Sequence, residues 1–254
     1  MSEDRLGRIV TEAPADRLPL WLLPHLYRYY ASGSRANHCV DAALTLAAAF
    51  GVVGIPARPW PVELVIASGA GRRPVRYGGN GRWDGNDFRG HCVLWLPEHG
   101  HFVDVTLEQF REAAGHGPLI GRVAAGVDRA TGQPTTRDWI TGGGTAVVQR
   151  PGYMLEYTAG SAAQASDLLA APLVRMNELG HRRAGTNLAS QALLMLTVTP
   201  EVVARARSGP FPRLRQLLDA LEGVPADVDS EGNWRFAWPA PTGSRPLLLD
   251  QIPL

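Results

Sequence analysis

The order of apolar and polar positions predicts one buried helix in the first quarter of the chain. From residue 38 to about residue 50 the sequence is apolar and rich in alanine, and Asp41 is its main polar position. A helix with so little polarity on any face is expected to be buried. Asn37 is a plausible N-cap, because a short polar side chain can accept from the free N–H groups of a first turn. Gly51 and Gly54 then mark the end of the helix.

Strand-like segments follow this helix. Residues 60–68 read as one strand that is rich in β-branched and aromatic side chains. Residues 91–97 and 101–107 have a strand-like pattern on either side of a short turn, which is typical of a hairpin. Residues 144–158 predict a second hairpin that turns at a Pro-Gly pair.

The rest of the chain is irregular before the strands and helical after them. Residues 1–16 are expected to be a loose arm, residues 18–32 short helical pieces broken by two prolines, and residues 69–90 a long loop or irregular hairpin. Three helices are predicted over residues 161–182, 187–207 and 211–222. The remaining tail is rich in proline and is expected to be irregular. Helices, antiparallel strands and helices in this order indicate an α+β fold. We therefore expect a core over residues 1–160 and a helical extension over residues 161–254, packed on that core.

Composition and charge narrow the classes of function. The chain has 254 residues, of which 45% are hydrophobic and 19% charged, as in globular proteins with a sizeable core. The net charge of +1 at pH 7 gives no field that would attract a nucleic acid or an anionic membrane, so neither is an expected partner. All 25 basic residues are arginines. Schiff-base lysines and a P-loop lysine are therefore excluded.

The cysteine count and the apolar runs suggest a cytoplasmic protein. Cys39 and Cys92 are too few for a disulfide framework. The first residues are polar and lack the apolar stretch of a signal peptide. The longest apolar run, residues 44–57, is shorter than the about 20 residues that cross a bilayer. Reduced thiols are the expectation in the cytoplasm.

Cys39, His91 and Asp104 form the candidate catalytic set. Cys39 falls in the predicted first turn, where the free N–H groups and the helix dipole favour a thiolate. His91 begins the first strand of the hairpin and Asp104 lies in the second, so the two residues can be cross-strand neighbours. An aspartate in a buried strand needs a partner. A histidine ring is such a partner, and the carboxylate would hold that ring in the tautomer of a general base.

Four segments in this order resemble the transglutaminase-like branch of the papain-like cysteine enzymes. They are Cys39 at the start of its Ala-rich helix, GIPAR at 54–58, GHCVLWL at 90–96 and FVDVTLEQF at 102–110. The resemblance covers roughly residues 35–110. It implies a papain/transglutaminase-like core with an N-terminal helix packed on an antiparallel sheet. It also implies that Cys39 is the nucleophile, His91 the acid and base, and Asp104 the residue that orients His91.

The resemblance further implies acyl transfer without a cofactor. The Cys39 thiolate would attack a carboxamide or thioester and hold the acyl group as a thioester, which water or an amine then removes. The Cys39 backbone N–H would bind the oxyanion together with a second donor, for which Asn37, His38 or a group farther upstream are candidates. Trp83, in the long loop, could line a substrate pocket. The expected partner is a small-molecule or peptide acyl substrate.

Three other uses of the same residues stay open. An amide-bond-forming acyltransferase in small-molecule biosynthesis could take its acyl group from a carrier-protein thioester. A non-catalytic binding or scaffold protein could retain the fold. Zinc could bind the three residues, with His38 or His101 as a fourth ligand, but no pair has the usual ligand spacing and no metal is expected.

The remaining chemistry-bearing residues have ordinary structural interpretations. Cys92 follows His91 on a strand, so it should point to the opposite face and into the core. His99 and His101 flank the hairpin turn and are expected to face solvent. The long loop carries five arginines, which could bind an anion but are more simply a solvated surface: Arg72, Arg73, Arg76, Arg82 and Arg89. The Gly-rich segment 141–145 lacks a following Gly-Lys-Ser, so it is a weak phosphate-loop candidate.

Overall fold

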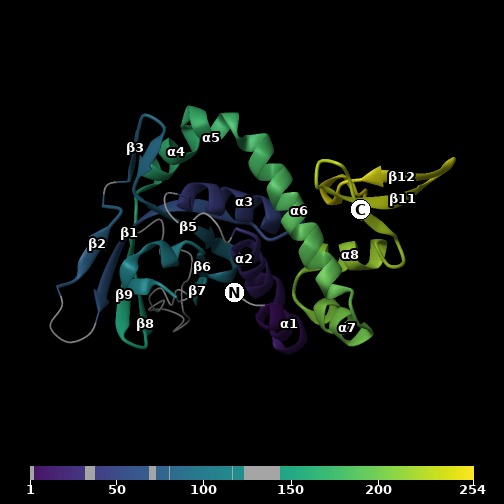
Figure 1. The fold of residues 1–254 in the computed structure, drawn as a ribbon, viewed down its shortest axis with the longest axis horizontal. Helices are drawn as coiled ribbons and strands as arrows, with labels where there is room; N and C mark the ends of the chain where they lie inside the picture. Colours follow the sequence, from purple (N-terminus) through teal and green to yellow (C-terminus); the bar gives the residue numbers. More distant parts are fainter. Residues whose placement is uncertain (1–2, 32–37, 69–72, 80, 116, 123–143) are drawn as a thin grey trace, which may run out of the picture. The chain divides into compact units, whose positions relative to one another are not determined.

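The structure is a computed structural model that describes residues 3–31, 38–68, 73–79, 81–115, 117–122 and 144–254. The fold is α+β, and the strand pairs of its sheets are antiparallel. The chain divides into two compact units (Figure 1). The sheet unit comprises Ala31–Leu44 and Pro56–Glu178, and the helical unit comprises Met1–Tyr30, Thr45–Ile55 and Leu179–Leu254. These bounds differ from the sequence-based division at residue 160.

The sheet unit is built on one large antiparallel sheet (Figure 1). Its strands run in the order β7-β6-β5-β1-β9-β8, and β2 pairs with β1. Their bounds are Arg58–Ser68 for β1, Val75–Tyr77 for β2, His91–Leu96 for β5, His101–Asp104 for β6, Leu119–Arg122 for β7, Thr145–Arg150 for β8 and Tyr153–Ala159 for β9. The three segments predicted as strands and hairpins are therefore confirmed. The β8–β9 turn needs its glycine, because Gly152 has φ 86°.

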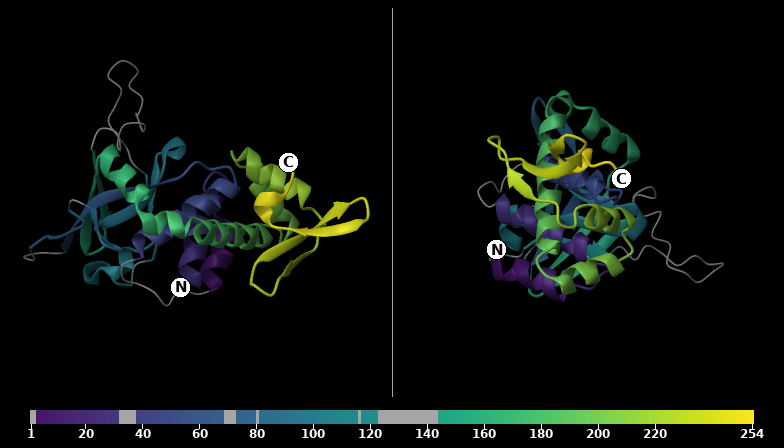
Figure 2. Two further views of the ribbon diagram at one scale, coloured as in Figure 1. Left: turned by 90° about the horizontal axis from the view of Figure 1, so that it is seen from above. Right: turned by 90° about the vertical axis from the view of Figure 1, so that its right-hand side faces the viewer.

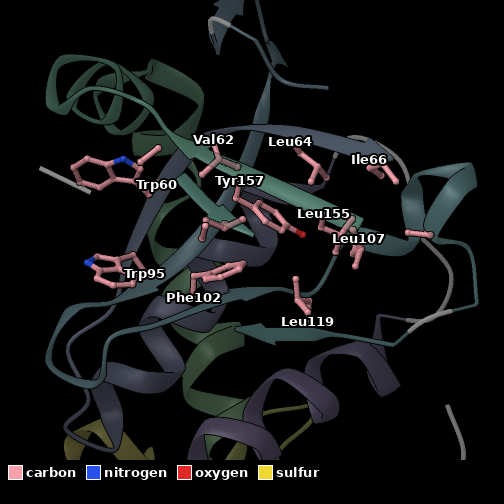
Figure 3. Close-up of a cluster of buried hydrophobic side chains, with 14 of the residues drawn as sticks. Trp60, Val62, Leu64, Ile66, Trp95, Phe102, Leu107, Leu119, Leu155 and Tyr157 are labelled. Carbon is pink, nitrogen blue, oxygen red and sulfur yellow. The ribbon is translucent and has the colours of Figure 1, made fainter. Parts of the chain in front are cut away.

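One face of this sheet forms the larger hydrophobic core of the unit (Figure 3). Alternate residues of β1 and β9 point into it, including Val62, Leu64 and Tyr157. The Tyr157 and Phe102 rings lie 4.8 Å apart at the centre of the cluster. Gly121 on β7 cannot carry a side chain, because a Cβ atom there would lie 2.4 Å from the Phe102 ring. The period-2 pattern that predicted the strands thus also selects the core residues.

A second, smaller cluster joins the start of helix α3 (Cys39–Val52) to the other face of β5. It contains Cys39, Val40, Ala43 and Cys92, together with residues of the short helices α4 (Ala162–Ala170) and α5 (Pro172–Met176). Helix α4 begins in a capping box at Ser161 and lies against β1. The single helix predicted over residues 161–182 is wrong, because Pro172 has no N–H to continue α4.

The segment predicted as a long loop or irregular hairpin contains a small hairpin of its own. Strands β3 (Arg82–Asp84) and β4 (Asp87–Arg89) pair so that Trp83 stands opposite Phe88. Their rings lie 5.4 Å apart and pack against the smaller cluster. The Trp83 indole N–H donates to the Leu168 carbonyl of α4 at 3.3 Å, which fixes the hairpin to the helix.

The N-terminal residues are a helix pair and not a loose arm, so that prediction is wrong. Helix α1 (Glu3–Glu12) buries Leu6, Ile9 and Val10 along one side. Helix α2 (Leu18–Tyr30) is continuous, although short pieces were predicted, because its buried apolar side chains outweigh the cost of Pro24. These helices belong with the C-terminal segment, since the Arg205 guanidinium donates to the carbonyls of Val10 and Thr11.

The rest of the helical unit combines three helices with a small sheet (Figure 2). The helices are α6 (Glu178–Leu196), α7 (Pro200–Ser208) and α8 (Pro212–Ala220). The single helix predicted over residues 187–207 is wrong, because α6 ends at Leu196 and a new helix, α7, begins after the Thr199 cap. The tail, predicted as irregular, is the sheet of β10 (Ala226–Val228), β11 (Trp234–Ala240) and β12 (Gly243–Leu247), whose last two strands project as a hairpin. The helical extension predicted for residues 161–254 is therefore only partly helical. None of the helices in the described ranges is both long and apolar enough to cross a membrane.

Candidate active site

Cys39 is the first residue of α3 and is almost fully enclosed, with 5% of its surface exposed. The N–H of Ala42 donates to the carbonyl of His38 at 2.9 Å, so His38 occupies the N-cap position. The helix thus begins one residue later than its predicted start at residue 38. Asn37, which the sequence suggested as the N-cap and as an oxyanion donor, lies outside the described residues. The Cys39 N–H belongs to the first turn, where N–H groups have no partner within the helix.

His91 and Asp104 meet through the β5–β6 hairpin. Leu94 pairs with Val103 in this hairpin. Continuing the register places His91 diagonal to Asp104 on the same face, which is close enough for their side chains to meet. The Nε2–H group of His91 donates to Oδ2 of Asp104 at 2.7 Å, and both side chains are about 1% exposed or less. This bond leaves Nδ1 as the acceptor atom of the neutral ring.

The imidazole of His91 interacts with both Asp104 and Cys39. Cys39 lies close enough to the ring to contribute to the raised pKa of His91. Because Asp104 holds Nε2, Nδ1 is the ring nitrogen that is left to take a proton. The structure therefore brings together the three residues that the sequence singled out, in the order thiol, imidazole, carboxylate.

Asp104 is buried as a carboxylate with a complete set of donors. Its Oδ2 atom accepts from the Tyr157 hydroxyl at 3.0 Å in addition to His91. Its Oδ1 atom accepts from the backbone N–H of Thr106 at 3.0 Å and from the Thr106 hydroxyl at 3.2 Å. A buried charge is tolerated only when it is paired and hydrogen-bonded in this way.

The charges around His91 favour its protonated form. Burial is the largest single influence and lowers the pKa of His91, but the charge and hydrogen bond of Asp104, with a smaller contribution from Cys39, raise the pKa to about 10. The phenol of Tyr157 also stays protonated. Burial and the nearby Asp104 charge raise the pKa of its phenol well above the ordinary value, so Tyr157 remains a donor.

Gln109 and Tyr157 are site residues that the sequence did not single out. The Gln109 side-chain amide donates to the Thr106 hydroxyl at 3.2 Å and to Nδ1 of His91 at 3.4 Å. Gln109 follows Thr106 in a single 3₁₀ turn, closed by a backbone hydrogen bond of 2.9 Å between them. Phe110 meets the His91 ring edge to face at 5.0 Å. A polar residue three positions after Thr106 was the one local signal in the sequence for Gln109.

The structure describes no contact between the His91 imidazole and the other candidate substrate-binding residues, His38 and Trp83. The Nδ1 atom of His38 lies 3.3 Å from the Asp41 carboxylate, and both side chains are about half exposed. Trp83 packs with Phe88 against the smaller cluster that includes Cys39. It therefore lines the surroundings of the thiol without any described contact to His91 or Asp104.

Cys92 is a packing residue, as its place in the strand alternation indicates. It is 2% exposed and lies in the smaller cluster, whereas its neighbour Val93 faces the larger one. Burial, followed by the nearby Cys39, raises the pKa of the Cys92 thiol well above its usual range. Cys92 is therefore held as an uncharged thiol.

The remaining candidates carry no assembled chemistry. Within the described ranges, no three His, Cys, Asp or Glu side chains are grouped so that they could hold a metal ion. Arg76 and Arg89 of the Arg-rich segment form exposed ion pairs with Glu63 and Asp84, and Arg72 lies outside the described residues. Most of the Gly-rich segment 141–145 also lies outside them. His99 and His101, which were expected to face solvent, are instead partly buried. Nδ1 of His101 lies 2.6 Å from the His99 carbonyl.

Comparisons with known proteins do not identify a family for this chain. No family model, no curated protein and no solved structure matches this chain. The likeness of its motifs to those of transglutaminase-like enzymes therefore rests on the four sequence segments, and the case for a function rests on the arrangement of Cys39, His91 and Asp104.

Proposed function

We propose that this protein is a cysteine-dependent acyl-transfer enzyme with a papain/transglutaminase-like core. The observation that carries the proposal is the buried His91 imidazole, which donates to Asp104 at 2.7 Å and whose pKa is also raised by the nearby Cys39. A nucleophile, a base and a residue that orients the base are the three parts that covalent catalysis by a thiol requires. The position of Cys39 at the start of α3 supports the same role, because a helix N-terminus favours a thiolate.

The proposed reaction begins with a proton transfer. Nδ1 of His91 takes the Cys39 proton, and Asp104 stabilises the resulting imidazolium. The thiolate then forms a bond to the carbonyl carbon of an amide or thioester, and the carbonyl π electrons move to oxygen. When the oxyanion collapses, the leaving nitrogen or sulfur takes the proton from Nδ1 and departs. The acyl group remains on Cys39 as a thioester.

The second half-reaction releases the acyl group. His91 removes a proton from water or from an amine, which attacks the thioester carbonyl and regenerates the Cys39 thiolate. Hydrolysis and amide formation use the same three residues. The choice depends on whether water reaches the acyl-enzyme before the amine does. A carrier-protein thioester is an alternative acyl donor, and its reaction at Cys39 would be identical.

Covalent trapping of the acyl group tests this proposal. The protein is incubated with p-nitrophenyl acetate, and the adduct is located by mass spectrometry after quenching in acid. We expect one acetyl group on Cys39 in the wild-type protein and in Cys92→Ala, and none in Cys39→Ala. Absence of an adduct on Cys39 while the protein remains folded would instead favour a binding or scaffold protein. Adding a primary amine then measures how the acyl-enzyme divides between hydrolysis and amide formation.

A further inference from the structure

The proposed acyl transfer needs two donors for the oxyanion, and α3 supplies one. The backbone N–H of Cys39 is in the first turn and has no partner within the helix. A second donor must lie beside the sulfur, within hydrogen-bond distance of the oxygen that becomes charged. The Nδ1 atom of His38 is 3.3 Å from the Asp41 carboxylate, so this imidazole has a competing partner.

The Gln109 side chain has the required chemistry and contacts the imidazole that serves Cys39 in the proposed mechanism. Its amide nitrogen carries two hydrogens. One hydrogen is directed to the Thr106 hydroxyl at 3.2 Å, and the other points toward Nδ1 of His91 at 3.4 Å. In the proposed mechanism Nδ1 takes the Cys39 proton, so the amide lies next to the atom that carries the transferred proton.

The contact between Gln109 and His91 depends on the charge of the imidazole. Neutral Nδ1 can accept from the amide, but 3.4 Å is at the long end for such a bond. In the imidazolium both ring nitrogens are donors, so this hydrogen bond is lost. Because the charge and hydrogen bond of Asp104 outweigh burial and favour the imidazolium, one N–H of Gln109 is then free to donate to another acceptor.

We propose that the Gln109 side-chain amide is the second donor to the oxyanion formed at Cys39. This inference rests on the acyl-transfer function proposed above. As the carbon–sulfur bond forms, the carbonyl π electrons become the negative charge on oxygen, and the freed N–H of Gln109 donates to that oxygen. When the oxyanion collapses, the carbonyl re-forms and the leaving group takes the proton from Nδ1 of His91. The amide returns to its starting contact.

The Thr106 hydroxyl keeps the amide in position. It accepts from Gln109 while donating to Oδ1 of Asp104 at 3.2 Å. The same carboxylate therefore orients His91 directly and Gln109 through one hydroxyl group. A donor fixed in this way needs little reorganisation when the charge develops, which is the condition for effective oxyanion stabilisation.

Acylation and alkylation of the same thiol separate this role from a structural one. Acylation by p-nitrophenyl acetate passes through an oxyanion, whereas alkylation by iodoacetamide displaces iodide at a saturated carbon and does not. We expect Gln109→Ala to slow acylation by about 10²-fold or more. Alkylation should proceed at the wild-type rate. Gln149→Ala, which removes an exposed glutamine from the edge strand β8, should change neither rate.

A second variant guards against loss of folding. Gln109→Glu keeps the shape of the side chain but has no N–H donor, so it should lose acylation to a similar extent. The inference is overturned if folded variants acylate at the wild-type rate, or if acylation and alkylation fall by the same factor. A wild-type protein that acquires no acyl group on Cys39 would overturn the proposed function itself, and that result is visible before any Gln109 variant is compared.

Discussion

His91 and Asp104 are joined by a 2.7 Å hydrogen bond between Nε2 and Oδ2, although each side chain is at most about 1% exposed. The pair is enclosed by donors and by an aromatic edge from Phe110. The imidazole therefore has one orientation and one neutral tautomer. The other ring nitrogen, Nδ1, is left to take a proton.

Replacing Asp104 with asparagine should disable the base. The Asp104→Asn substitution keeps the size of the side chain but removes the charge that favours the imidazolium, and the new amide can present a donor to Nε2. We expect acylation of Cys39 to fall by about 10²- to 10⁴-fold. The measurement is the rate of nitrophenolate release from p-nitrophenyl acetate at neutral pH. An unchanged rate in a folded Asp104→Asn protein would contradict the assigned role of Asp104.

The raised pKa of His91 predicts how stability depends on pH. The pKa is about 10 in the folded protein and about 6.5 in an unfolded chain. The native state therefore binds the proton more tightly. This contribution to stability is fully present below about pH 6.5 and is lost as the pH rises through about 10.

Urea unfolding between pH 6.5 and pH 10 measures this effect. The free energy of unfolding should decrease by on the order of a few kcal/mol across this range in the wild-type protein. In His91→Gln the decrease should be smaller, because the titrating group is missing while the remaining ionisable groups are unchanged. Equal slopes in the two proteins would mean that the folded state does not favour the His91 imidazolium.

The two cysteines should differ sharply in reactivity. In the folded protein Cys39 begins helix α3 and lies near enough to His91 to raise the pKa of that imidazole, whereas Cys92 is buried in the smaller cluster with its thiol held protonated. Iodoacetamide at about pH 6.5, where an ordinary thiol is almost entirely protonated, should label Cys39 and leave Cys92 unmodified. In denaturant the two cysteines should label equally and slowly. Peptide mapping measures both sites in one experiment, and equal labelling of the folded protein would contradict an activated Cys39.

Local patterns were enough to single out the candidate catalytic residues, because the position of each depends on short-range structure. Cys39 follows from a helix start, and His91 and Asp104 follow from one hairpin with a short turn. Tyr157 could not be found in this way. It reaches Asp104 from 53 residues away because β9 pairs with β1, and the sequence alone does not specify that pairing. Gln109 was missed for a different reason, since only a known His91 orientation shows what its amide faces.

The two compact units could not be predicted from local patterns, because the helical unit depends on contacts between the two ends of the chain. Arg205 donates to carbonyls of α1 that are almost two hundred positions earlier, and no local pattern reports such a contact. The tail was misjudged because its prolines suggested irregular structure. Pro239 instead lies in β11 beyond the residues that pair with β10, and Pro246 lies in the edge strand β12, where a missing N–H is tolerated.

Tyr157→Phe tests whether the enclosed carboxylate needs its fourth donor. The substitution removes only the hydroxyl that donates to Oδ2 of Asp104 at 3.0 Å and keeps the ring that packs on Phe102. Leaving part of a buried carboxylate without its donor should lower the free energy of unfolding by about 1–3 kcal/mol. Acylation of Cys39 should slow as well, because Asp104 then has one donor fewer to fix the oxygen that orients His91.

The matched control for this variant is Tyr153→Phe, four residues earlier on the same face of β9. It removes the same hydroxyl group from the same sheet but not from the Asp104 carboxylate. Urea unfolding and the rate of nitrophenolate release are measured for both variants. If Tyr157→Phe matches Tyr153→Phe in both measurements, Asp104 is held by Thr106 and His91 alone. A larger loss in Tyr157→Phe, in stability and in acylation together, assigns the orientation of Asp104 to β9 as well as to the hairpin that carries it.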